Sequence, residues 1–211
     1  MVKMTVFKDN TALILIDIQN DFCPGGALEV GEGNEIVEVA NKLQEKFRVK
    51  IATQDWHPPN HTSFASNHLE KLPFSTTEMF YGTQVLWPDH CIQGKKGAEF
   101  HPKLITKSTD LIIRKGFRTE IDSYSAFFDN DHKTPTGLGG YLKARGINSI
   151  YLCGLALDFC VYFSAIDGIN LDLEVNVIKD ACRAIDLDGS LEMAINDMKN
   201  KGVNLITSND L

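Results

Sequence analysis

The sequence predicts a doubly wound α/β fold, in which helices cover both faces of one mostly parallel sheet of six strands. Six short runs rich in apolar and β-branched residues recur along the 211-residue chain, and their apolar character, clearest in ALILIDI, is near-continuous rather than alternating. Strands of this kind are buried on both faces, which is typical of a parallel sheet. Segments with helical periodicity lie between several of these runs. Strands that alternate with helices form right-handed βαβ units.

The six predicted strands are rich in Val, Ile and Leu, which favour buried strands. In chain order they are ALILIDI at 12–18, VKIATQD at 49–55, DLIIRKG at 110–116, SIYLCGL at 149–155, LEVNVIKD at 173–180 and VNLIT at 203–207. Four segments between or after them have apolar residues at helical spacing. These predicted helices are NEIVEVANKLQEKF at 34–47, GLGGYLKARG at 137–146, DFCVYFSAIDGI at 158–169 and DGSLEMAINDMKNKG at 188–202.

Two stretches, residues 56–109 and 117–135, interrupt this alternation. They show little clean periodicity, and the first is rich in His, Pro, Ser, Thr and Gly. Long irregular connections in a compact domain are usually functional loops. In an open parallel sheet, ligands bind beyond the carboxyl ends of the strands. We therefore expect these stretches to surround a binding site.

Composition limits the domain organisation and the classes of function. A chain of this length with 43% hydrophobic residues is expected to form a single domain, residues 1–211, around one core. The net charge of −7 argues against a nucleic-acid surface and against an anionic membrane surface, because both need clustered Lys and Arg. No apolar run approaches the roughly 20 residues that cross a bilayer. Exposed helix faces and sheet edges leave a homo-oligomer open.

The cellular compartment is expected to be the cytoplasm. The N-terminus, MVKMTVFKDN, lacks the apolar segment and the cleavage site of a secretory signal. The five cysteines are odd in number, widely spaced and without CxxC pairs, so a disulfide framework is not expected. A reducing compartment agrees with both observations.

Polar or reactive side chains stand where four of the predicted strands end. They are Asp17, Asp55 with His57, Lys115, and Asp158 with Cys160. Because the carboxyl ends of parallel strands share one edge of the sheet, we expect these side chains to converge there. A single Asp at a strand end is more often a helix cap or a loop anchor. Polar or reactive residues at four strand ends together favour an active site over four separate structural roles.

Cys160 falls in the first turn of the helix predicted from Asp158, which we interpret as the N-cap. Free backbone N–H groups and the helix dipole favour a thiolate there. The same N–H groups suit the oxyanion that forms when sulfur adds to a carbonyl. Asp17 is the available carboxylate for a general base, and Lys115 is a cation that keeps it ionised. Cysteine, aspartate and lysine together make a complete nucleophilic set.

Asp55 and His57 are two residues apart on an extended segment, so their side chains point to the same side. A carboxylate with an imidazole suits a divalent metal such as zinc or iron. A third ligand has to come from elsewhere, and the candidates are His61, His68, His90, His101 and His132. The spacing of Asp and His is by itself a weak motif. A surface loop that happens to be rich in histidine is the competing interpretation.

Five stretches, in this order and spacing, resemble the bacterial nicotinamidases, also called pyrazinamidases, of the isochorismatase-like cysteine hydrolase superfamily. They are LIDIQNDFCPGGAL, TQDWHPPNHTSFA, WPDHCIQGKKGAEFHP, IIRKG and GLALDFCV. The resemblance covers about residues 11–207, and the pairing of QDWH with WPDHC separates nicotinamidases from metal-free members. It implies the isochorismatase-like fold, a three-layer α/β/α arrangement with a six-stranded, mostly parallel sheet.

The resemblance also implies the reaction and its residues. Position by position, Cys160 corresponds to the nucleophile, Asp17 to the general base and acid, and Lys115 to the third member of the triad. Backbone N–H groups of Ala156 and Cys160 correspond to the oxyanion hole, with a cis peptide bond before Ala156. The implied reaction hydrolyses nicotinamide to nicotinate and ammonia through a cysteine thioacyl intermediate, as a step of NAD salvage, and extends to pyrazinamide.

The same resemblance implies one divalent metal ion, zinc or iron, with manganese as a further candidate. Its ligands correspond to Asp55, His57 and His90, whereas His61 is left without a role because the additional histidine of some relatives comes later in the chain. The aromatic walls around the flat substrate ring correspond to Phe22, Trp87 and Tyr124.

Three alternatives stay open at this stage. The first is another amide or isochorismate hydrolase of the same superfamily. The second is a metal-activated-water hydrolase in which Cys160 is merely buried. The third is a flavodoxin-like binding module, which is disfavoured because GLGG at 137–140 neither follows a strand nor has the spacing of a dinucleotide-binding loop.

Overall fold

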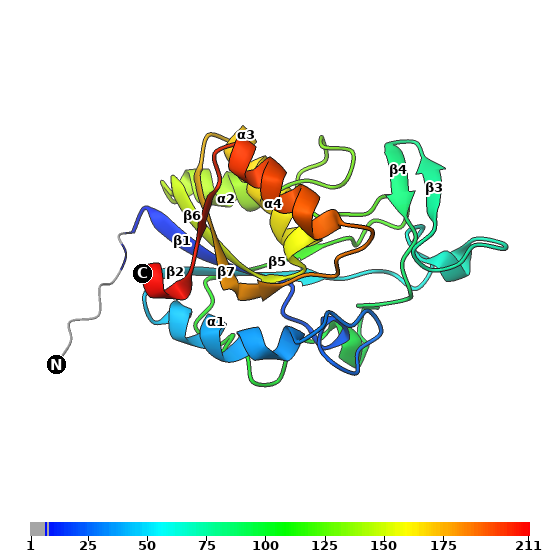
Figure 1. The fold of residues 1–211 in the computed structure, drawn as a ribbon, viewed down its shortest axis with the longest axis horizontal. Helices are drawn as coiled ribbons and strands as arrows, with labels where there is room; N and C mark the ends of the chain where they lie inside the picture. Colours follow the sequence, from blue (N-terminus) through cyan, green and yellow to red (C-terminus); the bar gives the residue numbers. More distant parts are fainter. Residues whose placement is uncertain (1–6, 8) are drawn as a thin grey trace.

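The computed structural model describes residue 7 and residues 9–211. The N-terminal segment in which no secretory signal was expected therefore falls mostly outside the described residues. The described chain builds a six-stranded sheet in the order β5-β2-β1-β6-β7-β8, with every neighbouring pair parallel (Figure 1). The strands are β1 (Thr11–Ile16), β2 (Val49–Asp55), β5 (Leu111–Lys115), β6 (Ser149–Leu155), β7 (Glu174–Arg183) and β8 (Asn204–Ile206). Each one coincides with a predicted apolar run.

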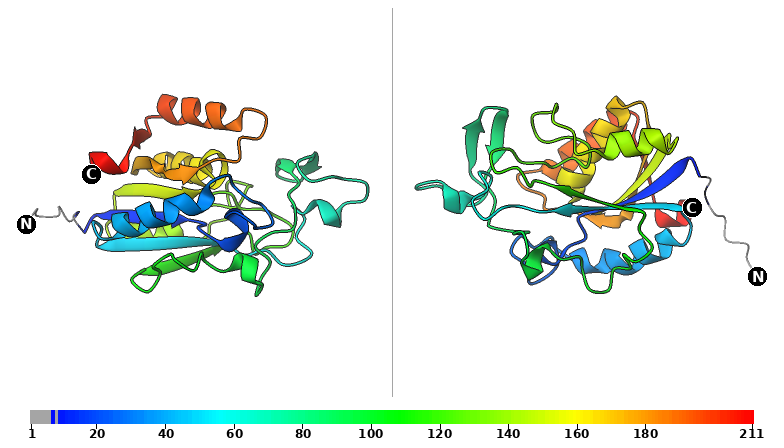
Figure 2. Two further views of the ribbon diagram at one scale, coloured as in Figure 1. Left: turned by 60° about the horizontal axis from the view of Figure 1, so that its bottom comes forward. Right: turned by 180° about the vertical axis from the view of Figure 1, so that it is seen from behind.

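Helices cover both faces of this sheet, as predicted. Helix α1 lies on one face, and α2, α3 and α4 lie on the other (Figures 1 and 2). Their bounds are α1 (Ile36–Gln44), α2 (Leu138–Ala144), α3 (Tyr162–Asn170) and α4 (Ser190–Asn200). The central strand β1 is buried at every position, which explains its uninterrupted apolar sequence. Buried side chains of the strands and helices form one hydrophobic cluster. Among the described residues, no helix combines the length and apolar character that a membrane span requires.

The segment after β6 departs from the predicted helix 158–169. Its first turn, Leu157–Val161, is a π-helix that leads into α3. The residue at the N-cap is Ala156, and it makes no side-chain capping hydrogen bond. Wide turns of this kind are frequent at functional sites. The sequence pattern cannot distinguish a π-turn from an α-helical turn because both present similar apolar spacing.

Asp158 is not the N-cap of this helix, so that interpretation is wrong. Its carboxylate accepts hydrogen bonds from the backbone N–H groups of Ile185 (3.0 Å) and Asp186 (2.7 Å) and from the hydroxyl of Ser190 (2.5 Å). These groups belong to the loop between β7 and α4 and to the first residue of α4. The buried carboxylate therefore ties the turn that carries Cys160 to a distant loop, a role that local sequence does not reveal.

Residues 56–109 contain one element that the sequence analysis missed. Strands β3 (Thr76–Met79) and β4 (Gly82–Val85) form an antiparallel hairpin. It stands apart from the main sheet, at the end of the molecule opposite the C-terminus (Figures 1 and 2). Most of its side chains are exposed or half-buried, so it has no apolar alternation that would predict a strand.

Gly154 on β6 packs closely against the backbone of the neighbouring strand β1. It has φ +134°, and a Cβ at this position would overlap the backbone carbonyl of Ile16 on β1. We expect Gly154→Ala to lower the free energy of unfolding by about 1–3 kcal/mol, because neither backbone can move without disturbing the sheet. Urea unfolding followed by circular dichroism measures the change.

Gly140→Ala is the matched control. Gly140 lies in α2, and a Cβ added there would meet nothing within 4 Å, so the substitution should be neutral or stabilise by up to about 1 kcal/mol. Equal stability changes in the two variants would contradict the packing argument.

Candidate active site

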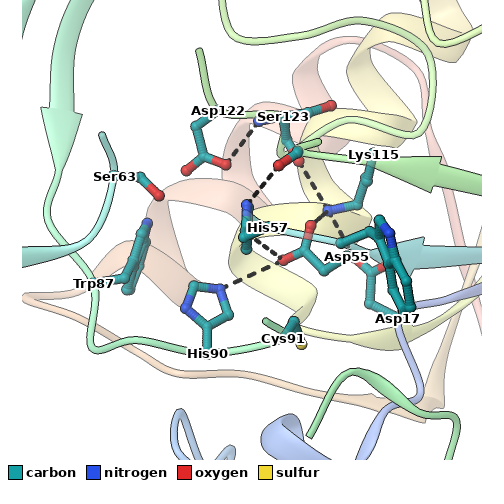
Figure 3. Close-up of polar contacts among 12 residues, drawn as sticks. Asp17, Asp55, His57, Ser63, Trp87, His90, Cys91, Lys115, Asp122 and Ser123 are labelled. Carbon is teal, nitrogen blue, oxygen red and sulfur yellow. Dashed lines mark hydrogen bonds and ion pairs between the residues drawn. The ribbon is translucent and has the colours of Figure 1, made fainter. Parts of the chain in front are cut away.

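Four strand ends bring the predicted site residues to one edge of the sheet. Asp17 follows β1, Asp55 closes β2, Lys115 closes β5, and Cys160 lies in the turn after β6. These four strands are neighbours in the order β5-β2-β1-β6, so their carboxyl ends are adjacent. The convergence expected from the sequence is therefore present, and Figure 3 shows the carboxylates of Asp17 and Asp55 on either side of Lys115.

Lys115 lies at the centre of this cluster and is fully buried. Its Nζ is 2.9 Å from Asp17 Oδ2 and 2.7 Å from Asp55 Oδ1. It also donates to the Ser123 carbonyl oxygen at 2.8 Å and lies 3.4 Å from the Cys160 Sγ. Burial works against the ammonium form, but the two carboxylates outweigh burial and raise the pKa of Lys115 well above its ordinary value. The side chain is therefore a fixed positive charge.

The two carboxyl groups beside Lys115 differ in proton affinity. Burial raises the pKa of Asp17 above its ordinary value, and Lys115 only partly opposes this rise. Burial also works against ionised Asp55, but Lys115 and His57 hold its pKa well below the ordinary range. Environments that separate the pKa values of two neighbouring acids assign them different tasks. Asp55 stays ionised, whereas Asp17 is suited to accept and return a proton.

One oxygen of Asp17 is available for that proton. Its Oδ1 accepts a hydrogen bond from the Thr53 hydroxyl at 2.6 Å. Within the described part of the chain, Oδ2 receives no hydrogen bond of good geometry, although the Lys115 ammonium lies 2.9 Å away. Asp17 also has φ +46°, which turns the chain sharply at the end of β1.

The thiol, not the thiolate, is the resting form of Cys160. Burial raises its pKa well above the ordinary value, the Lys115 ammonium opposes this rise, and the carboxylates of Asp17 and Asp55 add to it. This direction is opposite to the thiolate expected from the helix start, and burial is its largest cause. A neighbouring base has to remove the proton before sulfur can attack.

Asp55, His57 and His90 form a second cluster beside the first. Asp55 Oδ2 lies 3.2 Å from His57 Nε2 and 3.5 Å from His90 Nε2 (Figure 3). The Nδ1 atoms of the two histidines face the carbonyl oxygens of Gly116 and Pro88, each at 2.8 Å. A carbonyl only accepts, so each Nδ1 carries a proton, and the Nε2 atoms of both rings are directed at the same oxygen of Asp55. Backbone carbonyls commonly orient metal-binding histidines in this way.

This donor set fits a divalent metal ion. The three ligand atoms lie within 4.8 Å of one another, and all three residues are buried. One carboxylate oxygen and two imidazole nitrogens suit zinc or iron and leave coordination positions open.

His61 lies next to this cluster, but both of its ring nitrogens form hydrogen bonds with other residues. Its Nδ1 accepts the backbone N–H of Ser63 at 3.2 Å, so its Nε2 carries the proton and faces the Ile121 carbonyl at 3.3 Å. Burial lowers its pKa to about 4, which keeps the ring neutral. His61 does form a further group of potential ligand atoms with His57 and Asp122. Three histidines considered from the sequence belong to neither group within the described chain: His68, His101 and His132.

A small cavity of about 20 Å³ lies beside the two clusters. Cys160, Asp55 and His90 reach it. The three aromatic residues expected to form walls also line it: Phe22, Trp87 and Tyr124. The cavity is small and its walls are largely aromatic, which suits a small flat ligand rather than a nucleotide.

Several lining residues were not identified from the sequence. Phe159 contacts Trp87 edge-on, with ring centroids 4.9 Å apart, and its position next to Cys160 was the one available signal. The others come from loops without a recognisable pattern: Leu28, Asp122 and Ile185. Ala156 also lines the cavity, and the peptide bond before it is cis, as the resemblance implied.

Comparisons with known proteins agree with this geometry. The nicotinamidase of Acinetobacter baylyi is 52% identical over 203 residues, which cover 96% of this chain and 95% of that protein. The solved structure of an Acinetobacter baumannii nicotinamidase/pyrazinamidase has a TM-score of 0.95 at 53% identity and covers 96% of this chain and 98% of that chain. The pyrazinamidase of Pyrococcus horikoshii in complex with zinc has a TM-score of 0.75 at 31% identity, covering 94% and 99%.

The isochorismatase domain family matches residues 11–210, which is nearly the whole length. The six-stranded parallel sheet and the site at its carboxyl edge agree with that match. The chain therefore belongs to the isochorismatase domain family.

Proposed function

We propose that this protein is a metal-dependent nicotinamidase, which hydrolyses nicotinamide to nicotinate and ammonia in NAD salvage and also accepts pyrazinamide. One observation carries the proposal: Cys160 and two members of the candidate metal-ligand set, Asp55 and His90, line one small aromatic cavity, and Lys115 links the Cys160 thiol to the Asp17 carboxyl. The 52% identity to a nicotinamidase over 96% of the chain supports it.

In the first half of the reaction, Asp17 Oδ2 takes the proton of the Cys160 thiol, and the sulfur adds to the carboxamide carbon. The negative charge then moves to the carbonyl oxygen, which the backbone N–H groups of Ala156 and Cys160 stabilise. The C–N bond breaks when Asp17 returns the proton to the departing nitrogen, which leaves as ammonia. A thioester on Cys160 remains.

In the second half, Asp17 takes a proton from water, and the water oxygen adds to the thioester carbon. The C–S bond breaks, Cys160 recovers its proton from Asp17, and the product leaves as nicotinic acid, which releases its carboxyl proton to solvent to give nicotinate. Lys115 keeps its charge throughout because its pKa is well above the ordinary value. The Lys115 ammonium therefore stabilises the negative charge both when the charge is on Asp17 and when it is on the sulfur.

Asp55, His57 and His90 would hold the divalent ion. When bound, the ion would supply an electrophilic anchor for the nitrogen of the substrate ring and for water. Zinc in the Pyrococcus horikoshii pyrazinamidase supports zinc here, and the same donor atoms suit iron or manganese. The aromatic side chains of Phe22, Trp87 and Tyr124 would enclose the ring.

We further propose that residues 1–211 form one domain in the cytoplasm. A single hydrophobic cluster that spans the sheet supports the first point. The cysteines support the second, because all five are buried and free.

Cys160→Ala should lower kcat for nicotinamide at least about a thousandfold, because no other group can form the thioester. Ammonia release measures turnover, and calorimetric titration with nicotinate should show that the cavity still binds its ligand. Cys182→Ala is the control, because Cys182 is a buried cysteine on β7 and should retain activity within a few-fold. A Cys160→Ala variant within tenfold of wild type would instead favour attack by metal-activated water.

His57→Ala should reduce the metal content of the purified protein well below one ion per chain, because a three-residue ligand set loses one member. Elemental analysis by mass spectrometry measures the stoichiometry. His68→Ala removes a histidine that lies in neither ligand group of the described chain and should keep the wild-type metal content. Unchanged metal content in His57→Ala would remove this residue from the ligand set.

A further inference from the structure

Gln84 is a buried polar residue in an exposed hairpin. It is 1% exposed, whereas the other residues of β3 and β4 are exposed or half-buried. Burying a side-chain amide is unfavourable unless its N–H groups and its oxygen all find partners. The partners of Gln84 therefore indicate why the hairpin carries an amide at this position.

The amide nitrogen of Gln84 faces the wall of the cavity. Its Nε2 lies 2.8 Å from the Tyr124 hydroxyl and 3.0 Å from Asp122 Oδ2. Both of these residues line the cavity, but Gln84 does not. The nitrogen also lies 2.7 Å from the carbonyl oxygen of Val85 in its own strand.

The amide oxygen of Gln84 fixes the orientation of the side chain. It accepts hydrogen bonds from the Tyr81 hydroxyl at 3.1 Å and from Asn130 Nδ2 at 3.0 Å. Asn130 Oδ1 in turn accepts the backbone N–H of Tyr124 at 3.0 Å. Because both sides of the amide are engaged, the N–H groups cannot turn away from Tyr124.

The Tyr124 hydroxyl joins two walls of the cavity. Its oxygen also accepts the indole N–H of Trp87 at 3.0 Å. The two rings stand nearly perpendicular, at 81°, with centroids 6.1 Å apart. The Tyr124 hydroxyl oxygen thus keeps the two rings at a fixed separation, and the Gln84 amide binds the same oxygen from outside the cavity.

We propose that Gln84 is a positioning residue that acts through the Tyr124 hydroxyl. It sets the distance between the Trp87 and Tyr124 walls of the cavity, and this distance gives the cavity its preference for one flat six-membered ring. The inference rests on the proposed function, which places the substrate ring between these walls. Gln84 has no hydrogen bond to Cys160, Asp17 or Lys115 among the described residues. Its loss should therefore affect ring binding more than the chemical steps.

Gln84→Met keeps the length of the side chain and removes all its hydrogen bonds. We expect KM for nicotinamide to rise about tenfold, with kcat within about threefold of wild type. Gln84→Glu keeps the acceptor for Tyr81 and Asn130 but places a second carboxylate against Asp122, so its KM should rise at least as much. This second variant provides the test if the first does not fold. Thr83→Val, at the neighbouring exposed position, is the control and should keep the wild-type KM.

A double-mutant cycle with Tyr124→Phe tests whether Gln84 acts through the Tyr124 hydroxyl. If Gln84 acts through the hydroxyl, the double variant should show the KM of Tyr124→Phe alone, because the group that Gln84 positions is already absent. Multiplicative effects on KM, an unchanged KM in both Gln84 variants, or an equal fall in kcat would overturn the inference. If the wild-type protein does not turn over nicotinamide, the proposed function is overturned. If the wild-type protein is active and the Gln84 variants keep its KM, this inference alone is overturned.

Discussion

The site depends on one buried ammonium group held between two buried carboxylates. Lys115 Nζ contacts Asp17 and Asp55 within 3 Å, and none of the three side chains is more than slightly exposed. Removing Lys115 would leave two carboxyl groups in the interior without their counter-ion, which is strongly destabilising. Asp55 uses Oδ1 for Lys115 and directs Oδ2 to His57 and His90. The thiol cluster and the metal-ligand cluster therefore share one carboxylate and form a single electrostatic unit.

The parallel sheet is what keeps this unit in register. Asp55 and Lys115 are direct partners in the pairing of β2 with β5, so two adjacent backbones fix the ion pair. Asp17 follows β1, the neighbour of β2, and its carboxylate is held by the hydroxyl of Thr53 on β2. Groups carried by strand ends are placed more accurately than groups on long loops. A shift of one strand by one residue would separate the charges, so packing of the core and pairing of the charges select the same register.

The sequence predicted the parts of the molecule whose signals are local. All six strands could be predicted from runs rich in apolar and β-branched residues, most clearly the fully buried β1, and the placement of Asp17, Lys115 and Cys160 follows from the strand ends. Contacts between distant loops could not be predicted. Asp158 holds a loop some 30 residues away, at Ile185 to Ser190, rather than its own helix. Likewise, spacing alone could not choose among the histidines, because the choice depends on which rings the fold brings beside the Asp55 carboxylate.

The structure separates the reacting groups from the groups that enclose the ring. The former stand on the sheet edge, whereas Trp87, Tyr124 and Phe22 belong to loops and short turns. Asp21 links two of these loops, because its carboxylate accepts the N–H of Cys91, next to His90, and the N–H of Ala27. Loops can therefore change the shape of the cavity while the strands keep thiol, carboxyl and ammonium in place. Under the proposed function, ring recognition and bond cleavage would depend on different elements of the fold.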